Sequence, residues 1–386
     1  MPSVGLRNKL ALPLPGEIRG EWLNNRSTQE DLFVADWAWW LLIGFLAIAG
    51  LFVLLIVGIH TYYRVRFLEH IVRIFEEKPV FILPRGLPPD DAEDVAFESA
   101  PGLLLRGCYL KARGSRKGVI LFGLEFGSNR WAASSYCSRL REEGYDIFAY
   151  EPRNQGESST ESGYAPLHWV TDRDLIDGRA ALAYLRQRAD ASPTGIGILG
   201  VSKGGGVGLL LAAENRWVKC VATDGAYGAY TTMVPYMRRW VSIYSPHVRL
   251  QKAIPGWLYG TIGTAAMNRS ASRRHVRFLS VERAARRMRQ PLFMIHGEAD
   301  TYIKPEMART IFGIAGSKAK HLWLVPKAKH NQALNTVGEE YHSRLVAFFD
   351  THLAVLTEPG SDSSVNPQTD TPMPVAEERL AAVGLK

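Results

Sequence analysis

The sequence predicts an α/β domain with a mainly parallel central sheet and helices on both of its faces. From Val95 to about Leu353, short apolar runs alternate with segments of helical periodicity, the pattern of repeated strand–helix units. One of these runs passes into a helix at Ser202, a serine flanked by glycines. Asp300 and His330 follow two later runs. The sequence therefore places three polar side chains at one edge of a single sheet.

The composition is that of an ordinary globular chain with a basic segment. Its 386 residues are enough for one large α/β domain plus appendages. Three cysteines without C-x-x-C spacing disfavour a disulfide framework or a zinc site. Residues 228–289 hold twelve Lys and Arg against one acidic residue, Glu282. Such a cluster favours lipid phosphate or an anionic ligand over nucleic acid, since no nucleic-acid motif accompanies it, and a solvated basic face is the alternative.

The N-terminal region predicts a tail and one membrane span. Residues 1–36 are polar without an apolar period and predict a flexible tail. Residues 37–60 predict a transmembrane helix, because the uncharged run Trp37–Ile59 would span about 34 Å as a helix. Tryptophans and tyrosines flank this run, as at membrane interfaces, and the polar tail before it disfavours a cleaved signal peptide. More arginines follow the run than precede it, which favours a cytoplasmic C-terminal part.

The rest of the chain divides into three further parts. Residues 61–94 predict a juxtamembrane helix, with apolar positions at helical spacing, and then a proline-rich linker. Residues 95–354 form the predicted α/β domain, with a cap insertion at 228–290. Residues 355–386 are rich in Pro, Ser, Asp and Thr and predict a disordered tail.

Within the domain each element is justified by its apolar pattern. Two runs predict an antiparallel opening pair, six further runs predict strands and four segments predict helices. The strands are expected at 95–97, 103–110, 118–122, 145–150, 196–199, 218–222, 291–295 and 321–325, and the helices at 131–143, 172–189, 305–315 and 341–353, besides the helix after Ser202.

A serine hydroxyl is a poor nucleophile until a base removes its proton, and the base usually needs a carboxylate to orient it. His330 and Asp300 supply these two groups just beyond predicted strands. The chain order Ser, Asp, His is that of one serine-hydrolase architecture. Glu298 and Asp224 are rival positions for the carboxylate.

Residues from about Val95 to Leu353 resemble the α/β-hydrolase fold, the fold of esterases, lipases and serine aminopeptidases. The resemblance rests on four stretches in the family's order, which are 150–158, Gly200-Val201-Ser202-Lys203-Gly204, His296-Gly297-Glu298-Ala299-Asp300 and Lys329-His330. It implies a serine hydrolase in which Ser202 is the nucleophile, His330 the general base and acid, and Asp300 the orienting acid.

The same resemblance implies an oxyanion hole of two backbone N–H groups, from Lys203 and Leu124. The sequence departs from the family at Phe122-Gly123, where His-Gly is usual. Glu125 is a second departure, because a carboxylate near the oxyanion would oppose it. Either Glu125 points away and pairs with a cation such as Arg130, or the protein is not an efficient hydrolase.

The cap insertion combines seven aromatic and methionine side chains with the arginines above. They form either a pocket for an acyl chain with an anionic head or the small core of the cap itself. The histidines at 168, 247, 296 and 321 show no metal-ligand spacing and are interpreted as packing or loop residues, so neither a metal nor an organic cofactor is expected.

These observations favour a membrane-anchored serine hydrolase that cleaves ester or related acyl bonds through an acyl-enzyme, with lipid-derived acyl substrates and membrane lipid as partners. An acyl-CoA thioesterase or a serine peptidase of the same fold are alternatives within this class. A non-catalytic, membrane-tethered binding protein is the alternative from another class. The sequence leaves the oligomeric state open.

Overall fold

The computed structural model describes residues 17–77, 85–244 and 255–354, and for 17–36 and 240–244 it describes the backbone alone. The chain divides into two compact units, Met1–Arg66 and Phe67–Lys386. The predicted disordered tail, 355–386, lies outside the described residues, as do residues 1–16 and residues 78–84 of the proline-rich linker.

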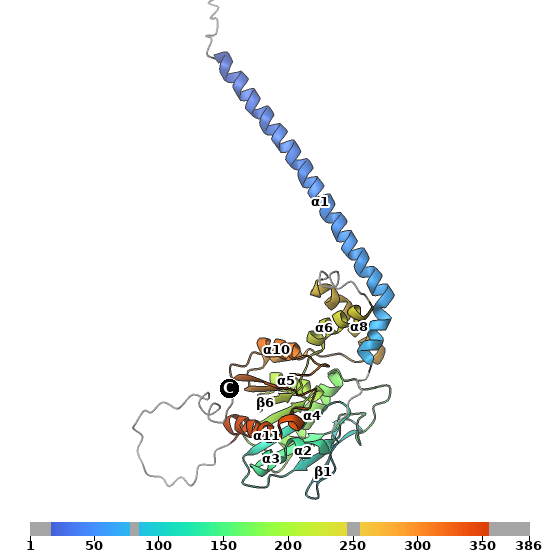
Figure 1. The fold of residues 1–386 in the computed structure, drawn as a ribbon, viewed down its shortest axis with the longest axis vertical. Coiled ribbons are helices and arrows are strands. Elements are labelled where there is room, and N and C mark those ends of the chain that lie inside the picture. The colour runs from blue at the N-terminus through green and yellow to red at the C-terminus, as the bar shows by residue number, and fades with distance from the viewer. Residues whose placement is uncertain (1–16, 78–84, 245–254, 355–386) are drawn as a thin grey trace, which may run out of the picture. The chain divides into compact units, whose positions relative to one another are not determined.

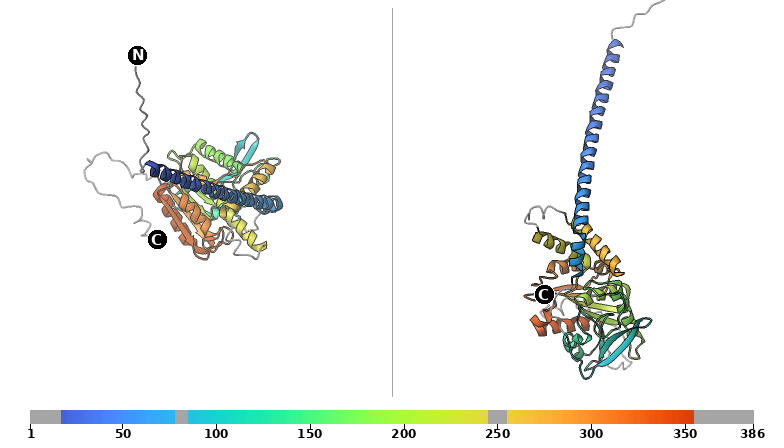
Figure 2. Two further views of the ribbon diagram at one scale, coloured as in Figure 1. Left: turned by 90° about the horizontal axis from the view of Figure 1, so that it is seen from above. Right: turned by 90° about the vertical axis from the view of Figure 1, so that its right-hand side faces the viewer.

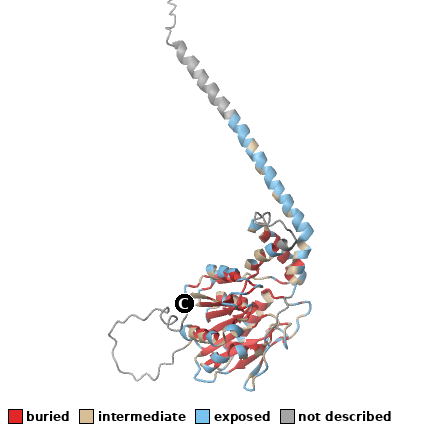
Figure 3. Cartoon of the chain, viewed as in Figure 1, coloured by how far each residue is buried: buried red, intermediate tan, exposed pale blue. Residues whose placement is uncertain are grey.

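The first element, α1, is a helix over Glu17–Glu76. It begins well before Trp37, so part of the segment predicted to be a flexible tail is helical. The physical reason is local, since no proline follows Pro15 there and Glu, Leu, Arg and Gln favour helix. From Trp37 onward α1 is long and apolar enough to span a membrane, and its most apolar stretch, of mean hydropathy 3.0, is exposed (Figure 3).

The second unit is built on an eight-stranded sheet of order β1-β2-β4-β3-β5-β6-β7-β8. The strands β3 to β8 run parallel, and β2 pairs antiparallel with both β1 and β4. This confirms the predicted α/β-hydrolase architecture with its antiparallel opening pair. The strands are β1 (Glu93–Ala100), β2 (Leu103–Leu110), β3 (Gly118–Gly123), β4 (Tyr145–Tyr150), β5 (Ile196–Val201), β6 (Val218–Asp224), β7 (Leu292–Gly297) and β8 (Lys320–Val325).

Helices cover both faces of the sheet (Figures 1 and 2), and a buried apolar cluster lies on each face. On one face lie α4 (Asp172–Gln187), α5 (Lys203–Glu214), α9 (Val281–Arg287) and α10 (Pro305–Ile314). On the other face lie α2 (Ala133–Tyr136), α3 (Ser138–Glu142) and α11 (Ala333–His352). The central strands are buried on both sides, which explains why they read as continuous apolar runs.

Two helices differ from the predicted ranges. The single helix predicted for 131–143 is a 3₁₀ turn at Arg130–Ala132 followed by α2 and α3. Serine hydroxyls here donate to backbone carbonyls three residues back, an alternative to helical backbone pairing. α11 begins at Ala333, before the predicted start, and bends at Gly338, whose φ is +33°.

The insertion between β6 and β7 contains α6 (Ala229–Tyr244) and α8 (Gly256–Arg274), which form the cap, and then α9, which packs on the sheet. A third apolar cluster joins α6 and α8 to Trp169 and to the end of α1. Phe75 of α1 stacks on Trp169 with ring centroids 4.8 Å apart, and the Trp169 indole donates to the Phe75 carbonyl at 2.7 Å. The C-terminal end of α1 is therefore an integral part of the second unit's core.

Candidate active site

The turn that carries Ser202 connects β5 to α5. Ser202 has φ +53° and ψ −116°, a backbone conformation that costs a residue other than glycine about 1–3 kcal/mol. Its N–H donates to the carbonyl of Asp224 at 2.7 Å, which ties the turn to β6. A Cβ on Gly200 would lie 2.5 Å from the carbonyl oxygen of Gly204, and a Cβ on Gly204 would lie 2.3 Å from the backbone of Gly123. The flanking glycines are therefore required because backbones approach too closely for any side chain.

The structure brings the predicted triad residues together. Asp300 follows β7 and His330 follows β8, so both lie at the same sheet edge as Ser202. Ser202 Oγ lies 3.1 Å from His330 Nε2, and His330 Nδ1 lies 2.6 Å from Asp300 Oδ2. With Nδ1–H donating to the carboxylate, Nε2 is left to accept the serine proton.

Asp300 is held in a fixed orientation by hydrogen bonds to both of its carboxyl oxygens. Its side chain is fully buried, and its Oδ1 accepts the backbone N–H groups of Tyr302 and Ile303, each at 2.8 Å. His296 packs beside it and binds the Ile303 carbonyl, which fits the structural role expected for that histidine. Of the rival acids, Glu298 is exposed, and Asp224 is buried beneath the nucleophile turn.

Glu125 does not pair with Arg130, the cation suggested for it from the sequence. Arg130 pairs instead with Glu151, Glu157 and Asp94. Glu125 is instead 4% exposed and accepts a hydrogen bond from Asn331 Nδ2 at 2.5 Å. Burial raises its pKa to about 7. A carboxyl group that is partly protonated at neutral pH opposes an oxyanion less than a full charge would.

Asp224 forms a second buried carboxyl group in the same region. Burial, and then the nearby carboxyl groups of Glu125 and Asp300, raise its pKa to about 7. Glu125 and Asp224 are thus two buried acids near the triad whose ionised forms are disfavoured, both mainly by burial. They hold less negative charge at neutral pH than their number suggests.

The two residues expected to supply oxyanion donors line one common cavity. Lys203 is the first residue of α5, where backbone N–H groups have no partner within the helix. Leu124 directly follows β3 and is nearly buried. Both line a cavity of about 30 Å³ together with Gly123 and Gly204, whereas Ser202 and His330 do not belong to its lining. The N-terminus of α5 favours negative charge near the Lys203 N–H.

The walls around the triad include residues that the sequence analysis did not single out as functional. The rings of Tyr227 and Tyr302 lie 6.4 Å and 5.4 Å from that of His330. Tyr227 donates to the backbone carbonyl of His168 at 2.5 Å. Burial, and the charges of Lys203 and His330, lower the pKa of His168 to about 3, so this imidazole is neutral. No sequence motif identifies these residues, because they lie in loops that are far apart in the sequence and meet at the site only in the folded protein.

The site is enclosed. Ser202 is 5% exposed and the His330 side chain 6%. A dry surrounding strengthens hydrogen bonds to developing charge. Among the described residues no group of three His, Cys, Asp or Glu side chains is placed to hold a metal ion.

Comparison with known proteins agrees with this architecture. The YfhR protein of Salmonella typhi is 21% identical over 285 residues, which cover 70% of this chain and 85% of YfhR. Protein bem46 of Schizosaccharomyces pombe is 23% identical over 204 residues, covering 53% of this chain and 57% of bem46. The Pyrococcus furiosus esterase Pf2001 superposes with a TM-score of 0.53 and 22% identity, covering 72% of this chain and 100% of the esterase.

The match to a family extends over most of the α/β domain. Residues 106–333 match the dienelactone hydrolase family, and this range includes Ser202, Asp300 and His330. It covers more than half of the chain. The chain is therefore a hydrolase with the α/β-hydrolase fold and belongs to the dienelactone hydrolase family.

Proposed function

We propose that the protein is a serine hydrolase that cleaves carboxylic esters through an acyl-enzyme, with Ser202, His330 and Asp300 as its catalytic triad. The observation that carries the proposal is the continuous chain of contacts from Ser202 Oγ to His330 Nε2 and from His330 Nδ1 to Asp300 Oδ2. A nucleophile, a base within hydrogen-bond reach and a group that orients the base are the components acyl transfer requires.

In the acylation half-reaction, His330 Nε2 takes the Ser202 proton as Oγ attacks the ester carbonyl carbon. The imidazolium that forms is stabilised by the buried Asp300 carboxylate 2.6 Å away. His330 then returns the proton to the departing alcohol oxygen, and the acyl group remains on Oγ. A water molecule, deprotonated by the same nitrogen, attacks the acyl-enzyme and releases the acid.

The tetrahedral intermediates carry a negative oxygen that needs fixed donors. We assign these to the backbone N–H groups of Lys203 and Leu124, next to the N-terminus of α5. A single donor of this kind contributes about 2.7–4 kcal/mol to transition-state stabilisation. The partly protonated Glu125 is compatible with this role, since its pKa is raised to about 7.

We also propose that the apolar part of α1 holds the enzyme at a membrane, with the α/β domain in the cytoplasm. The length and hydropathy of the segment from Trp37 support the span, and Arg64, Arg66 and Arg73 after it support the orientation. An enzyme held beside a bilayer meets lipid-derived acyl groups at high local concentration. Esters with a fatty-acyl group are therefore the proposed substrate class.

The test combines covalent labelling with a substrate panel. Full-length protein in detergent is treated with a fluorophosphonate probe, and Ser202→Ala serves as the matched variant. We expect labelling of the wild type only and turnover of p-nitrophenyl esters that rises with acyl length. Absence of both labelling and ester turnover in folded wild type would refute the proposal, and faster hydrolysis of acyl-CoA than of esters would assign a thioesterase instead.

A further inference from the structure

The first turn of α5 is unusual in having a single side chain. Lys203 is followed by Gly204, Gly205 and Gly206, so three of the first four residues after the nucleophile cannot anchor the backbone. Glycine has the greatest backbone freedom of all residues. Whatever holds the orientation of the first N–H groups of this helix must therefore act through neighbouring backbone or through Lys203.

The Lys203 side chain is buried and paired, although its residue type normally stays exposed. Its Nζ lies 2.7 Å from Asp174 Oδ1 and donates to the Leu167 carbonyl at 2.8 Å. Lys203 is 4% exposed and Asp174 3%. Buried ion pairs add little net stability compared with apolar side chains of similar volume, because desolvation offsets their attraction. Stability alone does not explain why a charge pair occupies this position.

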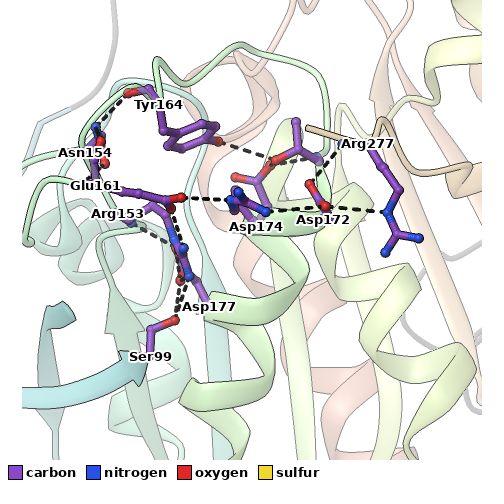
Figure 4. A network of polar contacts seen from close by, with 11 residues as sticks. Ser99, Arg153, Asn154, Glu161, Tyr164, Asp172, Asp174, Asp177 and Arg277 are labelled. Carbon is purple, nitrogen blue, oxygen red and sulfur yellow. Dashed lines mark hydrogen bonds and ion pairs between the residues drawn. The ribbon is translucent and has the colours of Figure 1, made fainter. Parts of the chain in front are cut away.

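Each carboxylate oxygen of Asp174 has its own partner, Lys203 on Oδ1 and Thr171 on Oδ2. Its Oδ2 accepts both the backbone N–H and the hydroxyl of Thr171, at 2.7 Å and 2.8 Å, in a capping arrangement at the start of α4. Asp172, the first residue of α4, accepts a hydrogen bond from the backbone N–H of Arg277 at 3.0 Å. This contact joins the start of α4 to the segment that follows α8 (Figure 4).

One turn further along α4, Asp177 forms a buried ion pair with Arg153 at 2.6 Å. Arg153 also binds Glu161, which binds Arg173, so the network closes around the first two turns of α4 (Figure 4). Asp174 is therefore a fixed point in the fold rather than a mobile surface carboxylate.

We propose that Lys203 and Asp174 are positioning residues for hydrolysis, whose ion pair holds the first turn of α5 so that the Lys203 backbone N–H stays oriented toward the substrate oxyanion. This inference rests on the proposed function. The side chain of Lys203 is tethered to α4, while its own N–H belongs to the nucleophile turn. One residue thus connects the polar network around α4 to the glycine-rich first turn of α5.

The test compares Lys203→Met and Asp174→Asn with the double variant that carries both changes. Lys320→Met is the matched control, because Lys320 Nζ donates to the carbonyls of Phe312 and Ala315 at the end of α10, away from the triad. Steady-state hydrolysis of p-nitrophenyl butyrate, the affinity of a trifluoromethyl ketone and the melting temperature are measured for each full-length protein. The ketone forms a tetrahedral oxyanion on Ser202 and so reports on the donor directly.

We expect kcat to fall about 10- to 100-fold in both single variants, with KM within about threefold of wild type, as for a small misplacement of a catalytic donor. Ketone affinity falls by the same factor. Each single variant leaves one buried charge unpaired and lowers the melting temperature, whereas the double variant regains most of the loss. Its kcat stays low, because the tether is still missing. Lys320→Met lowers the melting temperature and leaves kcat unchanged.

A double variant that regains both its melting temperature and its kcat would show that the pair is purely structural and would overturn the inference alone. Unchanged kcat and ketone affinity in Lys203→Met would do the same. Wild type that neither turns over esters nor reacts with a fluorophosphonate would instead refute the proposed function, and this inference would fall with it. The wild-type measurement therefore separates the two failures.

Discussion

Replacing Glu125 by Gln is expected to increase stability, and to do so only above mildly acidic pH. Glu125 is 4% exposed, and burial raises its pKa from 4.5 to about 7. A shift of roughly 2.5 units corresponds to about 3 kcal/mol by which folding disfavours the ionised form. Gln has the shape of the protonated acid, and its side-chain oxygen can still accept the hydrogen bond from Asn331.

The direction of the pH dependence of stability follows from how many protons the folded and unfolded states bind. Between pH 4.5 and 7 the folded state holds a proton on Glu125 that the unfolded state has lost, so the free energy of unfolding falls as pH rises through this range. Above about pH 7 Glu125 is ionised in both states, and the free energy of unfolding falls no further on its account. Glu125→Gln removes this part of the pH dependence, so the variant should match wild type near pH 4.5 and exceed it by up to about 3 kcal/mol at pH 8.

The assay is denaturant unfolding of the full-length protein in detergent from pH 4.5 to 8.5. Asp224 titrates in the same range, but it is present in both proteins, and replacing Glu125 lowers its pKa because one neighbouring carboxyl is removed. Glu298→Gln, at an exposed position, is the control and should leave the pH dependence unchanged. A stability difference between wild type and Glu125→Gln that is constant over this pH range would refute the reasoning.

Two further changes probe the triad and the packing of α1. Asp300→Asn should lower kcat by about 10⁴-fold with little loss of folding, because the amide favours the wrong tautomer of His330. Ester hydrolysis measured over a range of pH checks this. A kcat near that of wild type would argue against the triad. Phe75→Ala should lower the free energy of unfolding by about 3–5 kcal/mol, since Phe75 is 4% exposed and stacked on Trp169. Denaturant unfolding measures it, and a loss below about 1 kcal/mol would mean that the stacking contact contributes little.

Much of the site could be predicted because its residues have strong local signals. Ser202 between glycines at a strand–helix junction, with Asp300 and His330 just beyond later strands, is a pattern that parallel sheets place at one edge. Glu125 stands out in the sequence as a carboxylate near the expected oxyanion, but nothing in the sequence predicts its surroundings. Its partner, Asn331, is 206 residues away, and no periodicity relates the two.

The amino-acid sequence by itself determined the α/β architecture, the apolar helix from Trp37 and the order of the three polar side chains, because each depends on a pattern a few residues long. Tertiary structure alone decided that α1 extends to a stacking contact with Trp169, that Arg130 binds Glu151 in place of Glu125, and that Lys203 is tied to Asp174. These contacts join segments distant in the chain, and burial, which sets the charge of Glu125, exists only after the chain has folded.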